Sequence, residues 1–412
     1  VLKAYKYRIY PTSDQKEFLN KTFGCCRFVW NQMLHEKLDA YNKDIKVPQV
    51  TPAKYKTEYP FLKEVDSLAL ANIQLQLEKA FRNHFKNKNY FGVPKPKKKK
   101  EKQSYTTNNQ HNKIRIDSDK NLIYLPKIRS GIKIELHRQF TGTIKSVTIS
   151  KNPSNNYYAA VLVETEEVRN NIKEPISQKC GVDLGLSSFA AVTNDFGSYK
   201  IDHPHYLKKS EKKLIKLQRQ LSKKQKDSKN REKARLRLVK CYQHISDSRN
   251  DFLHKLSKAI IDENQVIVVK DLNVKSMIQN RYLAKSISDS GWSTFFRYLD
   301  YKAQWYGREL IKVDRFYPSS RICSNCGYVN KKLKISNRNW TCPVCGTKND
   351  KHINASVNLY KVGSERPDVK PVEMGSVDDR KVYALPKKQP IAEAGSQHLN
   401  RCGSSLVKLN QN

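Results

Sequence analysis

The chain has 412 residues, and its 78 lysines and arginines outnumber 39 acidic residues, which gives a formal net charge of +39 at pH 7. A charge this large indicates a polyanionic partner. The alternative is that the lysines only keep the protein soluble. No stretch approaches the ~18 apolar residues of a membrane span, and the opening VLKAYK lacks the apolar core of a signal peptide. We therefore expect a nucleic-acid partner in the bacterial cytoplasm, at the nucleoid, and no membrane contact.

The N-terminal part predicts a strand followed by helices. Residues 2–10 alternate as a short strand does, and Pro11, Thr12 and Ser13 then break the strand and supply a helix cap. From Asp14 to about Tyr90, apolar residues recur at helical spacings, which predicts a helical bundle.

A lysine-rich segment separates this bundle from a strand-rich region. Residues 93–102 hold six lysines and two prolines, which no packed element can bury, so we expect either a phosphate-facing loop or a plain linker. Residues 112–166 alternate in short strands separated by turn residues, a pattern typical of a small antiparallel barrel.

The second half predicts an α/β layer. An apolar strand with one acid, GVDLG at 181–185, precedes a second strand over 189–193 and a turn at 194–197. A long helical stretch follows over 206–261, and residues 201–240 hold 15 basic against 4 acidic residues, on a face that is either solvated or placed to follow a duplex backbone. A strand ending at Lys270, a helix over 292–307 and a strand over 309–313 complete the layer, and residues after 361 predict a disordered tail.

Four cysteines form the strongest local signal. Cys323 and Cys326 are followed, after fifteen intervening residues, by Cys342 and Cys345. This spacing predicts a tetrahedral zinc site, and since sulfur fills all four positions the ion is expected to be structural. The remaining five cysteines show no disulfide pattern, which fits a reducing compartment. Basic and aromatic flanking residues, among them Arg338 and Trp340, indicate either single-strand binding or an element that only staples the loop.

Asp183 is the second signal, because an acid inside an apolar strand is costly to bury unless it binds a metal or a cation. A second strand ends at Lys270-Asp271-Leu272, and a helix opens at Asp350. This is the layout of a ribonuclease-H-like site, in which separated carboxylates hold two metal ions about 4 Å apart.

Over residues 1–360 the chain resembles the TnpB family of transposon-encoded RNA-guided nucleases, which is similar to minimal type V CRISPR effectors. The matching segments are RIYPT at 8–12, RFVWN at 27–31, VDLG at 182–185, DFLHKLS at 251–257, VDRFYPSS at 313–320, the four cysteines and Asn354-Ala355. The resemblance implies a guide RNA, one protein per RNA, and a double-stranded DNA target that forms an RNA–DNA heteroduplex beside a short flanking motif.

The resemblance also implies a multidomain α+β architecture. Its expected parts are a wedge β-barrel at 1–10 and 93–173 with an inserted helical recognition domain at 11–92, a RuvC-like RNase H fold domain at 174–318 and 351–360, a zinc-binding target-nucleic-acid element at 319–350, and the tail at 361–412.

Two positions depart from the family pattern: Lys270 replaces a glutamate and His352 replaces an aspartate, so of three catalytic acids only Asp183 remains. A charge pair at ~4 Å is worth about 4 kcal/mol for an effective dielectric of ~20, so the lysine repels a divalent ion, and Mg²⁺ prefers oxygen ligands to imidazole. We expect no Mg²⁺ at this site and a direct pair between Lys270 and Asp183. Asp271 and Asp350 are not expected to rescue the site, since they point away from it.

The sequence therefore predicts an RNA-guided DNA-binding protein that is not an active enzyme and represses transcription by occupying guide-matched DNA, as nuclease-dead descendants of the family do. The alternative is a Mg-dependent RNA-guided DNA endonuclease that supports transposon maintenance. Candidate nucleic-acid contacts, each with a solvated surface residue as the alternative, are Asn72, Gln76, Lys79, Lys97, Lys98, Lys99, Ser104, Tyr105, Thr106, Arg338 and Trp340.

Overall fold

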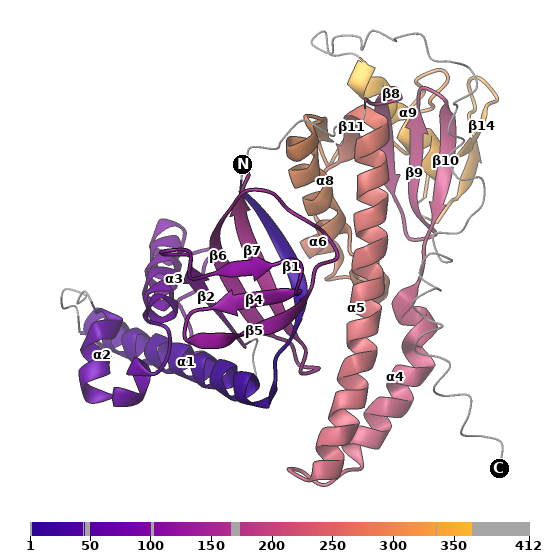
Figure 1. The fold of residues 1–412 in the computed structure, drawn as a ribbon. Coiled ribbons are helices and arrows are strands. Elements are labelled where there is room, and N and C mark those ends of the chain that lie inside the picture. Colours follow the sequence, from indigo (N-terminus) through magenta and orange to yellow (C-terminus); the bar gives the residue numbers. More distant parts are fainter. Residues whose placement is uncertain are drawn as a thin grey trace, which may run out of the picture. The chain divides into compact units, whose positions relative to one another are not determined.

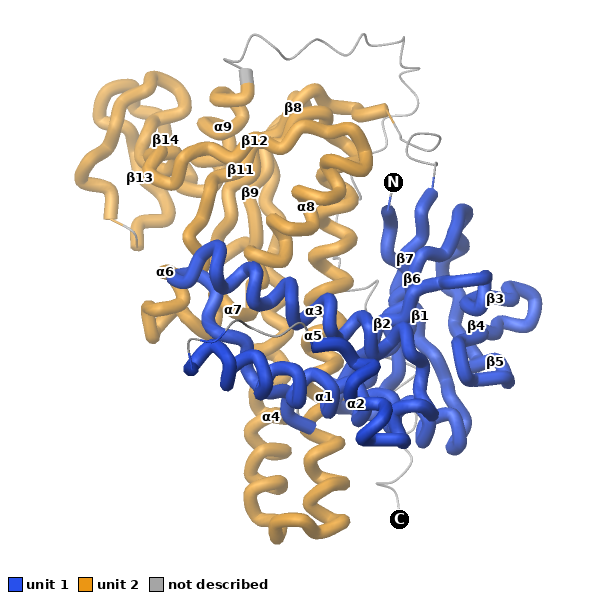
Figure 2. Tube along the Cα trace, turned by 90° about the vertical axis from the view of Figure 1, so that its left-hand side faces the viewer, with its two compact units in different colours: residues 1–168 blue, residues 169–412 orange. Residues whose placement is uncertain are grey.

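The computed structural model describes residues 2–43, 45, 50–99, 103–165, 174–334 and 336–364. The chain divides into two compact units, residues 1–168 and 169–412, which Figure 2 shows in blue and orange.

The first unit is built around an antiparallel sheet (Figure 1). Its strands lie in the order β2-β6-β7-β1-β5-β4-β3, so the predicted N-terminal strand is central, paired with β7 on one side and β5 on the other. The strands are β1 Leu2–Tyr10, β2 Gln103–Asn108, β3 Arg115–Asp117, β4 Leu122–Leu125, β5 Ile128–Glu135, β6 Thr143–Lys151 and β7 Tyr157–Glu164.

The expected closed barrel is not confirmed in the described residues. The sheet has two edges, β2 and β3, which do not pair with each other. Alternation of apolar residues specifies which face of a strand is buried, whereas closure requires an additional edge-to-edge pairing that alternation does not encode.

The helices of the first unit share one apolar core with this sheet. They are α1 Ser13–Asn42, α2 Pro52–Glu58, the short 3-10 helix η1 Pro60–Lys63 and α3 Ser67–Lys86. The predicted cap at the start of α1 is present as a capping box, because Thr12 and Gln15 each accept a backbone hydrogen bond from the other. The carboxylate of Asp66 caps α3 and also accepts the hydroxyl of Thr107 from β2, which ties the helix to the sheet.

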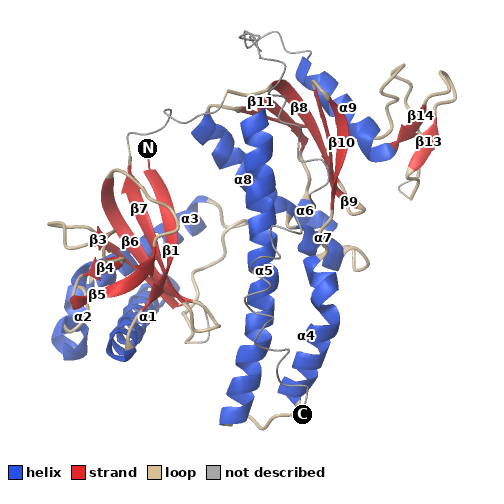
Figure 3. Ribbon diagram, turned by 45° about the vertical axis from the view of Figure 1, so that its right-hand side comes forward, coloured by secondary structure: helices blue, strands red, loops and turns tan. Residues whose placement is uncertain are grey.

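The second unit contains the expected α/β layer (Figure 3). Its mixed sheet has the order β10-β9-β8-β11-β12, in which β11 pairs in parallel with β8 and β12, while β9 pairs antiparallel with both β8 and β10. The strands are β8 Ser177–Leu184, β9 Ser188–Asn194, β10 Gly197–Asp202, β11 Asn264–Lys270 and β12 Glu309–Val313. The helices are α4 Tyr206–Ser222, α5 Lys229–Glu263, α6 Val274–Met277, α7 Ala284–Ser290, α8 Trp292–Tyr306 and α9 Lys351–Ser364.

Alternate residues of β11 face two different helical layers. Ile267 and Val269 pack in the core that α5 and α8 complete, while Val266 and Val268 pack with Leu359 of α9. The sheet is thus covered on both faces, which is why β11 reads as a continuous apolar run.

Three details differ from the expected elements. Strand β10 was not anticipated, and the single helical stretch expected over 206–261 is two helices, α4 and α5, joined through residues 223–228. Helix α9 continues to Ser364, so residues 361–364 are helical, while the rest of the expected tail lies outside the described residues. None of the described helices carries an apolar stretch long enough to cross a membrane.

Candidate nuclease centre and zinc element

Asp183 lies near the carboxyl end of β8, on the face of the strand that α9 covers. A β-carbon added to Gly181 would lie 2.2 Å from the carbonyl oxygen of Ser356, and one added to Gly185 would lie 2.6 Å from Cε1 of His352. Because Gly181, Asp183 and Gly185 share one face of the strand, the two glycines allow α9 to approach closely and place its first turn over Asp183.

His352, and not Lys270, is the direct partner of Asp183. Nδ1 of His352 lies 2.7 Å from Oδ2 of Asp183, and the two side chains are 21% and 15% exposed. Since a carboxylate only accepts hydrogen bonds, the imidazole N–H donates. The expected direct pair between Lys270 and Asp183 is not formed, because in the part of the chain that the structure describes the ion pair on Asp183 is with His352.

Lys270 nevertheless lies within the electrostatic reach of this acid. It ends β11, whose residue Val269 pairs in register with Val182 of β8. Burial lowers the pKa of Lys270, while the negative charges of Asp183 and Asp314 act in the opposite direction. The ammonium is therefore half-buried beside an acid that it does not touch.

Further positive charge surrounds the same acid. Burial lowers the pKa of Lys351, the charge of Asp183 opposes that shift, and Arg321 acts on both Lys351 and Lys270. Lys270, Lys351 and Arg321 thus bring positive charge close to Asp183, while Asp314 adds negative charge near Lys270.

Two neighbouring acids are already engaged elsewhere. Asp271 pairs with Arg315 at 2.7 Å. Asp350 caps α9 through the backbone N–H groups of His352 and Ile353 and pairs with Lys200 at 2.6 Å. Burial would raise the pKa of Asp350, yet the Lys200 ammonium and these backbone donors hold it below its usual value.

This donor set does not fit a pair of magnesium ions. Two-metal hydrolysis needs several oxygen ligands shared between hard cations. Here the carboxylate of Asp183 is bonded to an imidazole, and Lys270 stands where a second acid would be needed.

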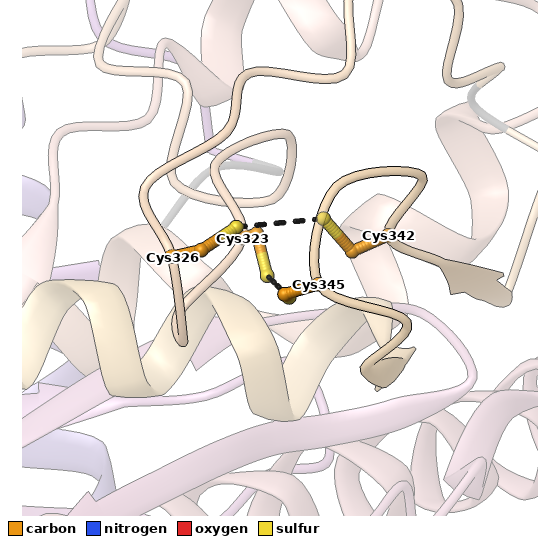
Figure 4. Close-up of side chains that lie close together, drawn as sticks. All are labelled: Cys323, Cys326, Cys342 and Cys345. Carbon is orange, nitrogen blue, oxygen red and sulfur yellow. Dashed lines mark hydrogen bonds between the residues drawn. The ribbon is translucent and has the colours of Figure 1, made fainter.

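The four cysteines, in contrast, fit a metal ion well (Figure 4). They lie between β12 and α9, beside the small sheet of β13 Asn339–Thr341 and β14 Lys348–Asp350, and their sulfur atoms lie within 4.8 Å of one another. Each Cys-x-x-Cys turn closes with the N–H of a left-handed glycine, Gly327 or Gly346, donating to the first cysteine's carbonyl at 2.9 Å. Hydrogen bonds from Thr347 lower the pKa of the Cys345 thiol to about 6, which favours the thiolate that a metal requires.

Helix α9 connects this four-cysteine element to the centre around Asp183. The side-chain amide of Asn354 donates to the Ile322 carbonyl at 2.6 Å and accepts from the Ser324 N–H at 2.8 Å. One turn later, Asn358 donates to the Ser319 and Ile322 carbonyls at 2.7 and 2.8 Å. Sequence reasoning quoted Asn354 only as a matching residue and missed Asn358, although the two asparagines have the i, i+4 spacing of one helix face.

Several expected nucleic-acid contacts are structural residues. Tyr105 is 3% exposed and belongs to the core of the first unit, and Trp340 packs against Cys323, Leu333 and Cys342. The ammonium of Lys97 lies 3.8 Å above the Trp30 ring. These three side chains are therefore occupied inside the protein.

The remaining candidates lie at or near the surface. Asn72 bonds the Leu68 carbonyl at 2.9 Å, and Thr106 shares a hydrogen bond with Thr148 at 2.8 Å. Ser104 is half-buried, and the exposed candidates are Gln76, Lys79, Lys98, Lys99 and Arg338. Within the lysine-rich segment, Lys97 is held in place, because the side chain of Asn31 of α1 bonds both its N–H and its carbonyl.

Comparisons with known proteins cover most of the chain. Family models match a "Probable transposase" of the IS605 OrfB type over residues 160–281, a "Cas12f1-like, TNB domain" over 292–359 and a "Helix-turn-helix domain" over 1–46. A solved Cas12f1–sgRNA–target DNA complex contains a chain with the same fold, with a TM-score of 0.57 at 12% identity over 87% of this chain and 98% of that one.

Two relatives extend over nearly the whole sequence. A "Putative RNA-guided DNA endonuclease" of Streptomyces pristinaespiralis is 34% identical, covering 88% of this chain and 90% of that protein. The "Putative RNA-guided DNA endonuclease InsQ" of Escherichia coli (strain K12) is 29% identical over 88% and 92%. The expectation that the chain is not an enzyme is contradicted by these relatives, which are named as endonucleases. The similarity over nearly the full length of both chains shows that this protein belongs to the TnpB, or IS605 OrfB, family.

Proposed function

We propose that this protein is an RNA-guided DNA endonuclease. It binds one guide RNA, pairs that RNA with a matching strand of a DNA duplex beside a short flanking motif, and hydrolyses the DNA near Asp183. The observation that carries this proposal is the 34% identity, over 88% of this chain, to a relative named as such an endonuclease. The net charge of +39 supports it, since both ligands are polyanions.

The chemistry proposed at Asp183 uses the side chains that are present. Lys270, Lys351 and Arg321 can hold a phosphodiester and stabilise the negative charge that develops on it during hydrolysis. The hydrogen-bonded pair of Asp183 and His352 is the group placed to move a proton at this point. Because the donor set does not fit two magnesium ions, hydrolysis at this centre would use these side chains.

We also propose that the four cysteines hold a structural zinc ion. All four positions of a tetrahedral site would be filled by Cys323, Cys326, Cys342 and Cys345, which leaves none for a reacting water. The ion would supply folding energy to the zinc element and no chemistry at Asp183.

A cleavage assay tests the proposed activity. The protein is reconstituted with its copurifying RNA and incubated with a duplex that matches the guide, in buffers with magnesium, with manganese or with a chelator. We expect cuts in the matched duplex that Asp183→Asn abolishes and that a mismatched duplex does not show. Persistent binding without cuts in every buffer would overturn the proposal.

A reversion experiment tests the cationic centre. The double change Lys270→Glu with His352→Asp restores oxygen ligands, so we expect tighter manganese binding in calorimetry and faster cleavage with divalent ions. Lys275→Glu, at an exposed residue of α6, serves as the control for the lysine-to-glutamate change at Lys270. Equal manganese affinity in the reverted and wild-type proteins would contradict this account of the centre.

A second candidate function is transcriptional repression through occupation of guide-matched DNA. The specific observation that favours it is the 2.7 Å bond between Asp183 and His352, which engages the acid with a side chain of the protein itself. A promoter-reporter assay separates the roles: occupation predicts equal repression by the wild type and Asp183→Asn, whereas repression through cleavage predicts a loss in the variant.

A further inference from the structure

Phe316 is a large apolar side chain that the protein leaves in solvent. Its side chain is 84% exposed, although it follows directly from the core strand β12. The backbone around it is well held, because the N–H of Phe316 donates to the side chain of Asp314 at 2.7 Å and the N–H of Tyr317 to the Asp314 carbonyl at 3.1 Å. The ring is therefore presented outward by a tight turn.

This turn lies at the edge of the sheet that carries the nuclease centre. Val313 pairs in register with Lys270, and the N–H of Asp271 donates to the Val313 carbonyl at 2.9 Å. Arg315 is fixed to the same edge through its ion pair with Asp271. Two residues span at most ~7 Å, so Phe316 remains close to Asp314, whose charge acts on Lys270.

Charged rather than apolar residues lie next to the ring in the chain and at the sheet edge. Asp314 and Arg315 precede Phe316, Arg315 pairs with Asp271 at 2.7 Å, and Lys270 ends the neighbouring strand β11 opposite Val313. A protein-docking surface is usually a contiguous apolar patch, whereas an exposed ring among cations is the arrangement on which single-stranded nucleic acids stack their bases.

We propose that Phe316 is a base-stacking residue that positions single-stranded DNA at the Asp183 centre, with Lys270, Arg321 and Lys351 holding the phosphodiester beside the stacked base. This inference rests on the proposed function, because the DNA strand that Phe316 would position is the one that the endonuclease would cut. It assigns Phe316 a positioning role rather than a catalytic one.

The test uses the full chain without guide RNA and two fluorescent oligonucleotides, oligo(dT) and the same strand with abasic sites. Stacking contributes about 1–3 kcal/mol per base, so Phe316→Ala should weaken oligo(dT) binding roughly 5- to 150-fold in anisotropy titrations, while abasic DNA should bind the variant and the wild type equally. Phe196→Ala is the matched control, since that ring is 69% exposed on the turn between β9 and β10.

A fluorescent reporter localises the contact, because a chain this basic also binds DNA at other surfaces. In Phe316→Trp the added indole should be quenched by oligo(dT) and not by the abasic strand, whereas in Phe196→Trp neither strand should quench it. An oligo(dT) affinity that is the same in Phe316→Ala and the wild type, or equal quenching by base-containing and abasic DNA in Phe316→Trp, would overturn the proposal. Neither readout needs guide RNA or cleavage, so a failed cleavage assay and a failed stacking assay are separate results.

Discussion

At the scale of single residues, Gly185 decides whether the His352 ring can reach Asp183. In Gly185→Ala the new methyl group would lie 2.6 Å from Cε1 and 2.9 Å from Nε2 of the imidazole, so the ring must move. We expect a destabilisation of about 1–3 kcal/mol in urea unfolding, together with a changed His352 signal in NMR. Gly24→Ala in α1 has nothing within 4 Å of the added carbon and should be neutral or stabilising. An unchanged His352 signal in Gly185→Ala would contradict this close packing.

The same residues show how far sequence reasoning reaches. It placed Asp183 in a strand, Lys270 at the end of another strand and a helix start at Asp350, because strand and helix boundaries follow from local patterns, and the structure has these elements. It assigned the wrong partner to Asp183, since the contact with His352 depends on how closely α9 approaches at Gly181, a tertiary property. Trp340 is a candidate for base contact in the sequence because it is an aromatic residue among basic ones, and Tyr105 because of its position in the family. Neither signal tells whether a ring lies in the core or in solvent, and both rings are buried.

At the scale of elements, the four-cysteine element and helix α9 should lose order together when the proposed zinc ion is removed. We expect about one zinc ion per chain in metal analysis, and none in Cys342→Ser. Removal of the metal by a chelator should increase hydrogen exchange in the first turns of α9, because Asn354 and Asn358 are bonded to the carbonyl of Ile322, which lies next to Cys323. Full protection of α9 from hydrogen exchange in the metal-free protein would contradict this coupling. In Cys342→Ser, added chelator should cause no further increase in exchange.

The junction of α5 and β11 predicts a dependence of stability on pH. Burial, followed by the charge of Asp262, raises the pKa of Glu263 from 4.5 to about 7. An acid whose pKa is raised by folding weakens the fold once the unfolded chain ionises, so its destabilising effect grows as pH rises from about 4.5 to about 7 and is then constant. Glu263→Gln should therefore raise the melting temperature relative to the wild type at pH 8, with little difference at pH 4. An equal shift at both pH values would show that burial of the charge is not the cause.

At the scale of the whole molecule, the net charge of +39 predicts a steep dependence of nucleic-acid binding on salt. A protein that contacts about 6–10 phosphates loses about 10³–10⁵-fold in affinity between about 50 and about 200 mM salt through counterion release. We expect a loss of affinity in this range for the guide-matched duplex. If the exposed Lys79 touches a phosphate, Lys79→Gln should reduce the slope of log affinity against log salt concentration by about one. An affinity that does not change with salt would contradict an electrostatic origin.

Helix α9 carries residues of two sites, His352 beside Asp183 and Asn354 at the four-cysteine element, and this restricts which sequence changes the protein can tolerate. Successive residues turn by about 100° around a helix, so His352 and Asn354 project from nearly opposite sides. A substitution at position 352 changes the centre around Asp183 but leaves Asn354 and Asn358 bonded to the four-cysteine element. An insertion or deletion between positions 352 and 354 would misalign both sites at once. An aspartate can thus be exchanged for a histidine at the first site without disturbing the second, but the length of this segment is fixed for both.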